Sequence, residues 1–308
     1  MFFINAFKGN NKFLTYLLGT ILIIIITQII GILPPLITLL VQAINNGNVD
    51  LNIISNISNA TSSQNLNLLL MLFPFVLGFI TYFIIIKYLH HKKIKDVITE
   101  RPKFDIKRFI ISFSVWGGLT LISLFFSGSS NNSSLVWNFQ PQEFFVLLAI
   151  GLLILPMQTS FEEFLFRSYF MQGFAVTTKT RWAPLLVTSI VFGLLHSANP
   201  EVQEFGFLTA MPTYIIMGLV LGLTVVMDGG LEIALGLHYA NNLFSSLLYT
   251  SDTSTLQTPA LFLDTKPEMS PFESVGILIY SIIFILICKR IFKWKDWGKI
   301  FRKIEIDE

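Results

Sequence analysis

Long apolar runs separated by short polar segments dominate this chain. A helix rises about 1.5 Å per residue, so crossing about 30 Å of hydrocarbon takes about 20 consecutive, mainly apolar residues. Eight segments approach that length: residues 13–33, 66–88, 106–126, 146–172, 182–198, 210–227, 231–249 and 270–288. The pattern predicts about eight membrane-spanning helices. The first can continue past Pro34 and Pro35 as a kinked helix, and Pro156 should kink the fourth.

Positive charges fall in alternate connections between these segments. They gather before residue 13, in 87–108, in 167–181 and after 288, which together hold all but Lys266 of the 21 lysines and arginines. Because cytoplasmic loops carry an excess of Lys and Arg, both termini are predicted to be cytoplasmic. His90 and His91, beside lysines, are expected among solvated headgroups. Residues 289–308 are predicted to form a basic cytoplasmic tail whose aromatic side chains anchor it to anionic lipid.

The composition supports a membrane protein. The 308 residues are 53% hydrophobic and 13% charged, and the mean hydropathy is +0.67, far more apolar than a soluble domain of this size. We therefore expect an all-α polytopic protein with a single integral membrane domain, residues 1–308. Its net charge of +2 implies no nucleic-acid partner. Membrane lipids and a membrane-associated peptide or protein are the expected partners. The abundance of Asn and Ile is typical of AT-rich bacterial genomes, so we expect a bacterial plasma membrane.

Three groups of polar and charged side chains interrupt the apolar segments. They are Glu162, Glu163 and Arg167 in the fourth segment, Phe192 with His196 in the fifth, and His238 with Asn242 in the seventh. Such groups are costly in lipid and commonly mark a functional site. Each also has a structural interpretation, since ion-pair networks resemble sites and a lone membrane histidine often only bonds a neighbouring helix.

Helical spacing separates the two glutamates. Successive residues point about 100° apart on a helix, whereas residues four apart lie one above the other. Glu163 is therefore predicted to pair with Arg167. Glu162 is left to project elsewhere, on a face shared with the apolar Phe166, which makes it the better candidate for chemistry.

The three groups are also predicted to lie at similar depth. Taking residues 172, 182 and 230 as cytoplasmic ends, Glu162 lies about 15 Å into its helix, His196 about 21 Å, His238 about 12 Å and Asn242 about 18 Å. We therefore expect one polar cavity between the fourth, fifth and seventh helices.

These residue types can hydrolyse a peptide bond. A carboxylate with a histidine can deprotonate a water, and His238 and the Asn242 amide can donate hydrogen bonds to the oxyanion that forms when that water attacks a carbonyl. The set Glu162, His196 and His238 also matches three zinc ligands with an open fourth position. The sequence contains no H-E-x-x-H motif, which excludes the zinc-protease helix.

Three motifs resemble one protein family. Glu162-Glu163-Phe-Leu-Phe-Arg167, Phe192-Gly-Leu-Leu-His196 and His238-Tyr-Ala-Asn-Asn242 are similar, in order and spacing, to the E-E-x-x-x-R, F-x-x-x-H and H-x-x-x-N motifs of the CPBP family. This family, also called Abi, comprises intramembrane CAAX proteases and bacteriocin-processing enzymes. The resemblance covers about residues 145–250, which would form the catalytic core.

The resemblance implies a fold and residue roles. It implies an all-α membrane fold around a polar cavity, with Glu162 and His196 activating water, His238 and Asn242 stabilising the oxyanion, and Glu163 and Arg167 in support. Family members have been named metalloproteases, and their mechanism is also described as glutamate-dependent. A zinc ion would require Glu162 to be both ligand and base, so no obligatory cofactor is predicted and zinc stays an option.

The resulting hypothesis is an intramembrane endopeptidase that cuts near the membrane surface. Eukaryotic relatives cut prenylated C-terminal tripeptides, and bacterial relatives are associated with peptide maturation, signalling or bacteriocin immunity; the sequence does not choose among these. The alternative is a non-catalytic immunity or scaffold protein, or a transporter, that uses the same cluster for binding. Retention of all the motif residues favours the enzyme. Gly218 and Gly222 indicate close helix packing rather than the broken helices of a transporter.

Overall fold

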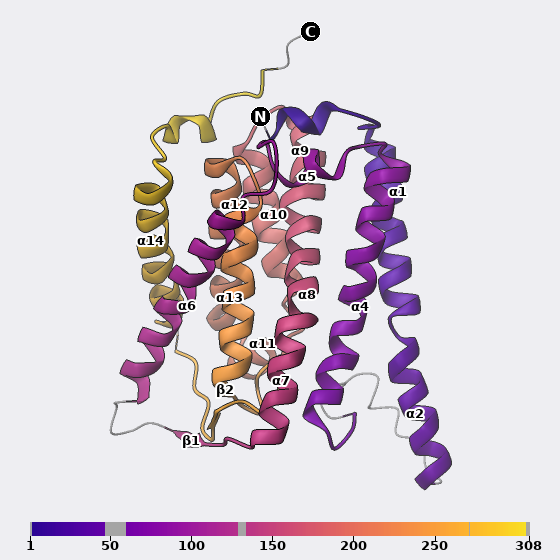
Figure 1. Cartoon of the computed structure of the whole chain (residues 1–308), viewed down its shortest axis with the longest axis vertical. Coiled ribbons are helices and arrows are strands. Elements are labelled where there is room, and N and C mark those ends of the chain that lie inside the picture. Colours follow the sequence, from indigo (N-terminus) through magenta and orange to yellow (C-terminus); the bar gives the residue numbers. More distant parts are fainter. Residues whose placement is uncertain (1, 47–59, 129–133, 271, 306–308) are drawn as a thin grey trace.

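The computed structural model describes residues 2–46, 60–128, 134–270 and 272–305. Within them, long helices run side by side, and both termini lie at one end of the bundle, here called the terminal end (Figure 1). Among these described residues, six helices are long and apolar enough to cross a membrane; they span Phe13–Gln42, Gln64–Leu89, Ile106–Phe125, Pro141–Thr178, Phe207–Asp228 and Glu273–Phe292. The protein is an all-α polytopic membrane protein.

The first predicted span is a longer, composite helix. α1 (Phe13–Ile25) continues through a π-helical turn (Ile26–Ile30) to α2 (Leu33–Asn46), as expected for a helix that passes Pro34 and Pro35. Next come α4 (Gln64–Ile84), which a π-helical turn (Ile85–Leu89) extends, the short α5 (Ile94–Ile98), and α6 (Ile106–Gly128).

The fourth span is interrupted where its sequence predicts. α7 (Pro141–Leu153) and α8 (Leu155–Glu163) meet at Ile154, two residues before Pro156, which cannot donate a backbone hydrogen bond. After α8 the chain forms a π-helical turn, η5 (Phe164–Phe170), and then α9 (Met171–Thr178). The π-helical turn begins directly after the two glutamates, and such turns occur often at functional sites.

The fifth and seventh spans are shorter than predicted. α10 (Trp182–Leu195) has 14 residues and α13 (Glu232–Leu248) has 17, so α10 rises only about 21 Å. Asn199 precedes Pro200, which disfavours helical backbone at the residue before it, and the separate helix α11 (Pro200–Phe205) starts there. Gly206, with φ +88°, then admits the turn into α12 (Phe207–Asp228).

A small sheet lies at the end of the bundle opposite the termini (Figure 1). Its strands are β1 (Leu135–Trp137), β2 (Tyr249–Thr250) and β3 (Phe262–Asp264), in the order β1-β3-β2. β3 pairs antiparallel with β1 and parallel with β2. The hydrophobic pattern does not predict these strands because each is only two or three residues long.

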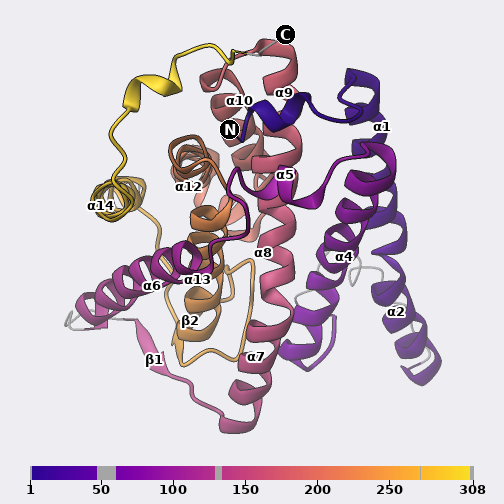
Figure 2. The same ribbon diagram turned by 45° about the horizontal axis from the view of Figure 1, so that its top comes forward.

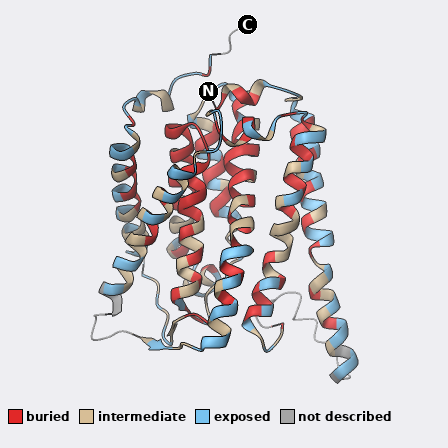
Figure 3. Ribbon diagram, in the orientation of Figure 1, coloured by how far each residue is buried: buried red, intermediate tan, exposed pale blue. Residues whose placement is uncertain are grey.

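Burial divides the helices into inner and outer ones. Figure 3 shows buried residues concentrated in the central helices, whereas α1, α2 and α14 (Glu273–Phe292) show more exposed residues. Many exposed side chains on these outer helices are large and apolar, as in Leu14, Ile37 and Ile282. Apolar side chains on the outside of a helical bundle suit contact with lipid. The polar side chains of α8 and α13 face the protein interior instead.

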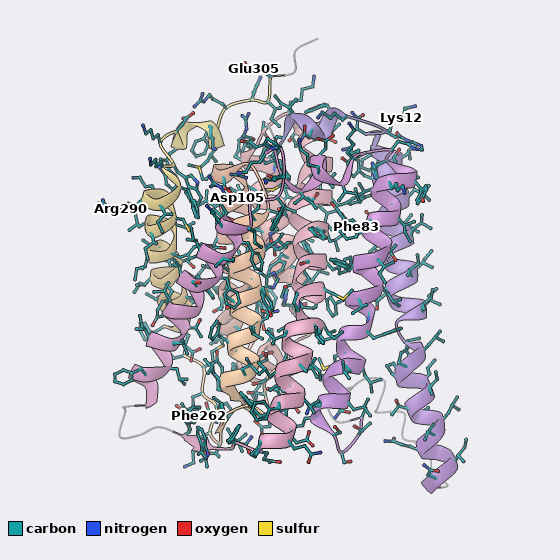
Figure 4. All side chains as sticks on the ribbon, in the orientation of Figure 1. Lys12, Phe83, Asp105, Phe262, Arg290 and Glu305 are labelled. Carbon is teal, nitrogen blue, oxygen red and sulfur yellow. The ribbon has the colours of Figure 1, made fainter. Side chains whose placement is uncertain are left out.

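Aromatic rings fix α8 and η5 against α4. The ring of Phe164 lies 5.8 Å from Phe79, 5.0 Å from Tyr82 and 5.3 Å from Phe83, measured between centroids. Figure 4 shows Phe83 pointing from α4 toward the neighbouring inner helix. Buried aromatic pairs add to the stabilisation that their area supplies. This contact holds the glutamate-bearing helix in a defined position.

A charged cluster, Arg101, Arg108, Asp228 and Glu232, joins four helices at the terminal end. Arg101 donates to Asp228 at 2.6 Å and to Glu232 at 3.2 Å, and Arg108 also pairs with Asp228. The indole of Trp294, which follows α14, donates to Asp228 at 3.1 Å. Figure 2 shows this end turned forward, where the N-terminal segment, α5 and the segment after α14 lie. The cluster fastens α6, α12, α13 and α14 together.

Two residues at this end differ from expectation. His90 is fully buried rather than solvated: its Nδ1 lies 2.7 Å from the Asn10 carbonyl and its Nε2 2.9 Å from the Tyr169 hydroxyl. Burial lowers the pKa of His90 to about 4. Trp294 is only 6% exposed, so this aromatic residue of the tail packs inside the protein, whereas Phe301 is 75% exposed. The loop and the tail fold onto the bundle at this end and bury both side chains.

Gly230→Ala should weaken the charged cluster. A Cβ at this position would overlap the Glu232 carboxylate and lie 2.8 Å from Arg101 Nη1. We expect the free energy of unfolding to fall by about 1–3 kcal/mol, as overpacking does. Gly118→Ala in α6 is the matched control, because nothing lies within 4 Å of its Cβ, and it should stabilise by about 0.5–1 kcal/mol. Thermal unfolding in detergent measures both; equal shifts would contradict the packing argument.

Candidate active site

A buried ion pair and a histidine form the centre of the site. Arg167 donates to Glu163 Oε1 at 3.2 Å, the i, i+4 pair that the sequence predicts, and also to the Gly218 carbonyl of α12 at 3.2 Å. The same Glu163 oxygen lies 2.7 Å from His238 Nδ1 on α13. Glu163 and Arg167 are fully buried, and His238 is 4% exposed. Charges so buried must be paired, and here Glu163 links η5 to α13.

Glu162 projects from the same turn toward a different set of groups. Its Oε1 accepts a hydrogen bond from the side-chain amide of Gln158, one turn earlier on α8. Its Oε2 lies 3.8 Å from His238 Nε2, too far for a direct hydrogen bond but close enough for a bridging water. The imidazole of His238 therefore lies between the two carboxylates.

Asn242 enters the site through Gln158. The Asn242 amide donates to Gln158 Oε1 at 3.1 Å, and its own Oδ1 accepts from Asn241 at 3.1 Å. Trp116 of α6 donates its indole N–H to Asn241 Oδ1 at 3.2 Å. Asn242 and His238 lie one turn apart on α13, as predicted, and both face α8.

His196 lies beside this network at the end of α10. It caps the helix, and its Nδ1 lies 2.7 Å from the Phe192 carbonyl. Its ring stacks on Tyr214 of α12 at 4.5 Å and lies 4.7 Å from the Phe192 ring. Phe192 in turn contacts the guanidinium of Arg167, 4.2 Å from the ring centroid, and His238, 6.0 Å between rings. Phe192 thus separates His196 from the ion pair.

The predicted residues therefore come together, with one difference in pairing. Glu162, Glu163, Arg167, His238 and Asn242 join through direct contacts or through Gln158. The expected partnership of Glu162 with His196 does not take the form of a hydrogen bond: among the residues that the structure describes, Glu162 contacts Gln158 and His238. His196, at the end of α10, is held instead by the Phe192 carbonyl and the Tyr214 ring.

The predicted zinc set does not fit this geometry. In the described ranges, no group of three or more His, Cys, Asp or Glu side chains is arranged to hold a metal ion. His238 Nδ1 is occupied by Glu163, and His196 Nδ1 by a backbone carbonyl. Zinc binding by Glu162, His196 and His238 would require these side chains to move.

Two further residues of the site, Gln158 and Tyr214, lie outside the three sequence motifs. Gln158, 6% exposed, bridges Glu162 and Asn242. Tyr214 stacks on His196. Gln158 could have been found, because it is an amide in an apolar segment, one helical turn before Glu162. Tyr214 gives no such signal, since an aromatic residue is ordinary in a membrane helix.

The fold and this cluster define a membrane protein with a buried glutamate–histidine–asparagine site. Residues 140–244, which include all of the motif residues, match the family described as type II CAAX prenyl endopeptidase Rce1-like. The chain is also 29% identical to the uncharacterized protein YyaK of Bacillus subtilis (strain 168) over 285 residues, which cover 89% of this chain and 92% of YyaK. No solved structure matches. The resemblance to the CPBP family of CAAX proteases is confirmed.

Proposed function

We propose that this protein is an intramembrane endopeptidase that hydrolyses a peptide bond near the membrane surface with a water activated by Glu162. The observation that carries the proposal is the placement of His238 between two carboxylates, 2.7 Å from Glu163 and 3.8 Å from Glu162. The Rce1-like match of residues 140–244 supports it. Charged groups buried inside a membrane bundle cost free energy, and their presence therefore commonly marks a functional site.

The hydrogen bonds fix which ring nitrogens face the reaction. A backbone carbonyl only accepts, so His196 carries a proton on Nδ1 and, when neutral, has Nε2 free as an acceptor. An ionised Glu163 also only accepts, so His238 donates from Nδ1 and turns Nε2 toward Glu162. Glu163 and Arg167 therefore act by orienting His238.

The proposed reaction begins at Glu162 Oε2. A water beside this oxygen gives its proton to the carboxylate, with His196 Nε2 assisting, as its oxygen attacks the carbonyl carbon of the substrate. The negative charge moves to the carbonyl oxygen, where protonated His238 Nε2 and the second Asn242 N–H donate to it. Collapse of this intermediate breaks the C–N bond, and the proton held by Glu162 passes to the leaving amine.

The location of the protein is part of the proposal. The positive charges at the terminal end, together with the Bacillus relative, support a bacterial plasma membrane with both termini in the cytoplasm. The substrate is then a membrane-associated peptide or protein whose cleaved bond reaches the depth of Glu162.

Peptide mass spectrometry tests the activity. Cells that lack this protein are complemented with wild type, Glu162→Gln or the exposed Glu268→Gln, and their membrane and secreted peptides are compared. We expect one defined set of cleaved termini with wild type and Glu268→Gln, and its absence with Glu162→Gln, because an amide cannot accept the water's proton. Equal restoration by Glu162→Gln would reject hydrolysis in favour of a non-catalytic scaffold, immunity or transport role.

A further inference from the structure

Gln158 occupies a position that no family motif specifies. It lies on α8, one turn after the break at Ile154 and one turn before Glu162, and its side chain is buried. Its amide has two chemically different ends, and both are used: Nε2 donates to Glu162, and Oε1 accepts from Asn242 at 3.1 Å. An apolar residue would suit this lipid-embedded helix better, so the amide calls for a functional reason.

The direction of every hydrogen bond in this network follows from its first donor. The indole N–H of Trp116 can only donate, so the atom of Asn241 that it meets must be the oxygen. The nitrogen of Asn241 then faces Asn242 Oδ1, and the nitrogen of Asn242 faces Gln158 Oε1. The Gln158 nitrogen consequently points at Glu162. Four donors, from α6, α13 and α8, thus align toward one carboxylate, and aligned hydrogen bonds strengthen one another.

This alignment distinguishes the two oxygens of Glu162. Oε1 is held by the Gln158 amide, whereas Oε2 faces His238 across 3.8 Å. Because a carboxylate with one oxygen bound cannot rotate freely, the other oxygen keeps a fixed direction toward the place where water would lie.

We propose that Gln158 is the positioning residue of the reaction: it donates to Glu162 Oε1, anchors that carboxylate to Asn242 on α13, and so presents Oε2 to the attacking water. The inference rests on the proposed hydrolytic function. Trp116 acts at a distance by fixing the orientation of the amides.

A double-mutant cycle on thermal stability tests the hydrogen bond between Gln158 and Asn242 without reference to activity. Gln158→Leu and Asn242→Leu are made singly and together in the full chain, and thermal unfolding in detergent is followed. Because each single change breaks the same hydrogen bond, the double variant should lose less in Tm than the sum of the single losses. Gln172→Leu is the control: Gln172 is also buried but donates to the Asp96 carbonyl at 3.2 Å. The Tm loss of Gln172→Leu should therefore add to the Tm loss of Asn242→Leu. Additive Tm losses for Gln158→Leu and Asn242→Leu would show that Gln158 does not bridge the two helices.

Kinetics test the positioning, with a fluorogenic peptide that spans the bond found by mass spectrometry. We expect Gln158→Leu to lower kcat about 100-fold with KM little changed, as misplacement of a reacting group does. Gln158→Glu, when ionised, keeps an acceptor for Asn242 but cannot donate to Glu162. Its kcat should therefore fall at least as far as that of Gln158→Leu. Trp116→Phe should lower kcat less than about tenfold because the three amide side chains stay in place.

The outcomes separate this inference from the function on which it rests. If wild type and Gln172→Leu cleave the peptide, and Gln158→Leu or Gln158→Glu cleaves with an unchanged kcat, Gln158 does not position Glu162 and the inference is overturned. If wild type cleaves no peptide, the proposed function fails, while the stability cycle still decides whether Gln158 bridges the two helices.

Discussion

Replacing Arg167 by methionine should lower the free energy of unfolding by about 3–5 kcal/mol, the cost of leaving one member of a buried ion pair uncompensated. The guanidinium is fully buried and donates to Glu163 and to the Gly218 carbonyl, each at 3.2 Å. Without it, Glu163 keeps only its hydrogen bond with His238, and the Gly218 carbonyl loses its side-chain donor in the interior. Methionine keeps much of the side-chain volume, so the loss reports on the charge and hydrogen bonds more than on a cavity. Reversible unfolding in mixed micelles measures it.

Two comparison variants make that result specific. Arg302→Met removes a pair with Asp296 in which both side chains are more than half exposed; exposed pairs contribute about 0–1 kcal/mol, so stability should hardly change. Adding Glu163→Gln to Arg167→Met removes the unpaired charge, and the double variant should be more stable than Arg167→Met alone. A double variant that is less stable would show that packing against Phe192, not the buried charge, sets the cost.

Hydropathy predicts the membrane fold well but not where each helix ends. It places the second span at 66–88, and the structure has Gln64–Leu89. It extends the fifth through Ala198, whereas α10 ends at Leu195. The difference arises because an apolar average does not register the backbone constraint of Asn199-Pro200, which begins four residues after Leu195. The same limit hides β1, β2 and β3, which are too short for any periodicity.

In the site, too, contacts within one helix could be predicted from the sequence, whereas contacts between helices could not. The Glu163–Arg167 pair follows from spacing within one helix and is present. The partner of Glu162 depends on how α8, α10 and α13 are rotated against each other, which spacing along one helix cannot reveal. The structure places His238, not His196, nearest to Glu162. The sequence thus predicts the contact within one helix but not the contacts between helices.

The two histidines should therefore differ in effect when each is replaced by glutamine. We expect His238→Gln to lower kcat/KM about 1,000-fold or more and His196→Gln about 100-fold, both within the usual range for acid–base groups. His238 contacts both carboxylates and is 4% exposed. His196 is half-buried and reaches the site only past the ring of Phe192. Steady-state cleavage of the same fluorogenic peptide gives both values.

Stability separates chemistry from folding in this comparison. His238→Gln also changes the partner of the buried Glu163, so we expect it to lose stability, whereas His196→Gln, whose ring rests on Tyr214 at a helix end, should lose little. His90→Gln is the control for a fully buried histidine outside the site: it should lose stability and keep kcat. If His196→Gln proves the more damaging to kcat while His238→Gln is mild, His196 is the partner of Glu162 during the reaction. A rotation of the α10 end toward α8 would then have to precede hydrolysis.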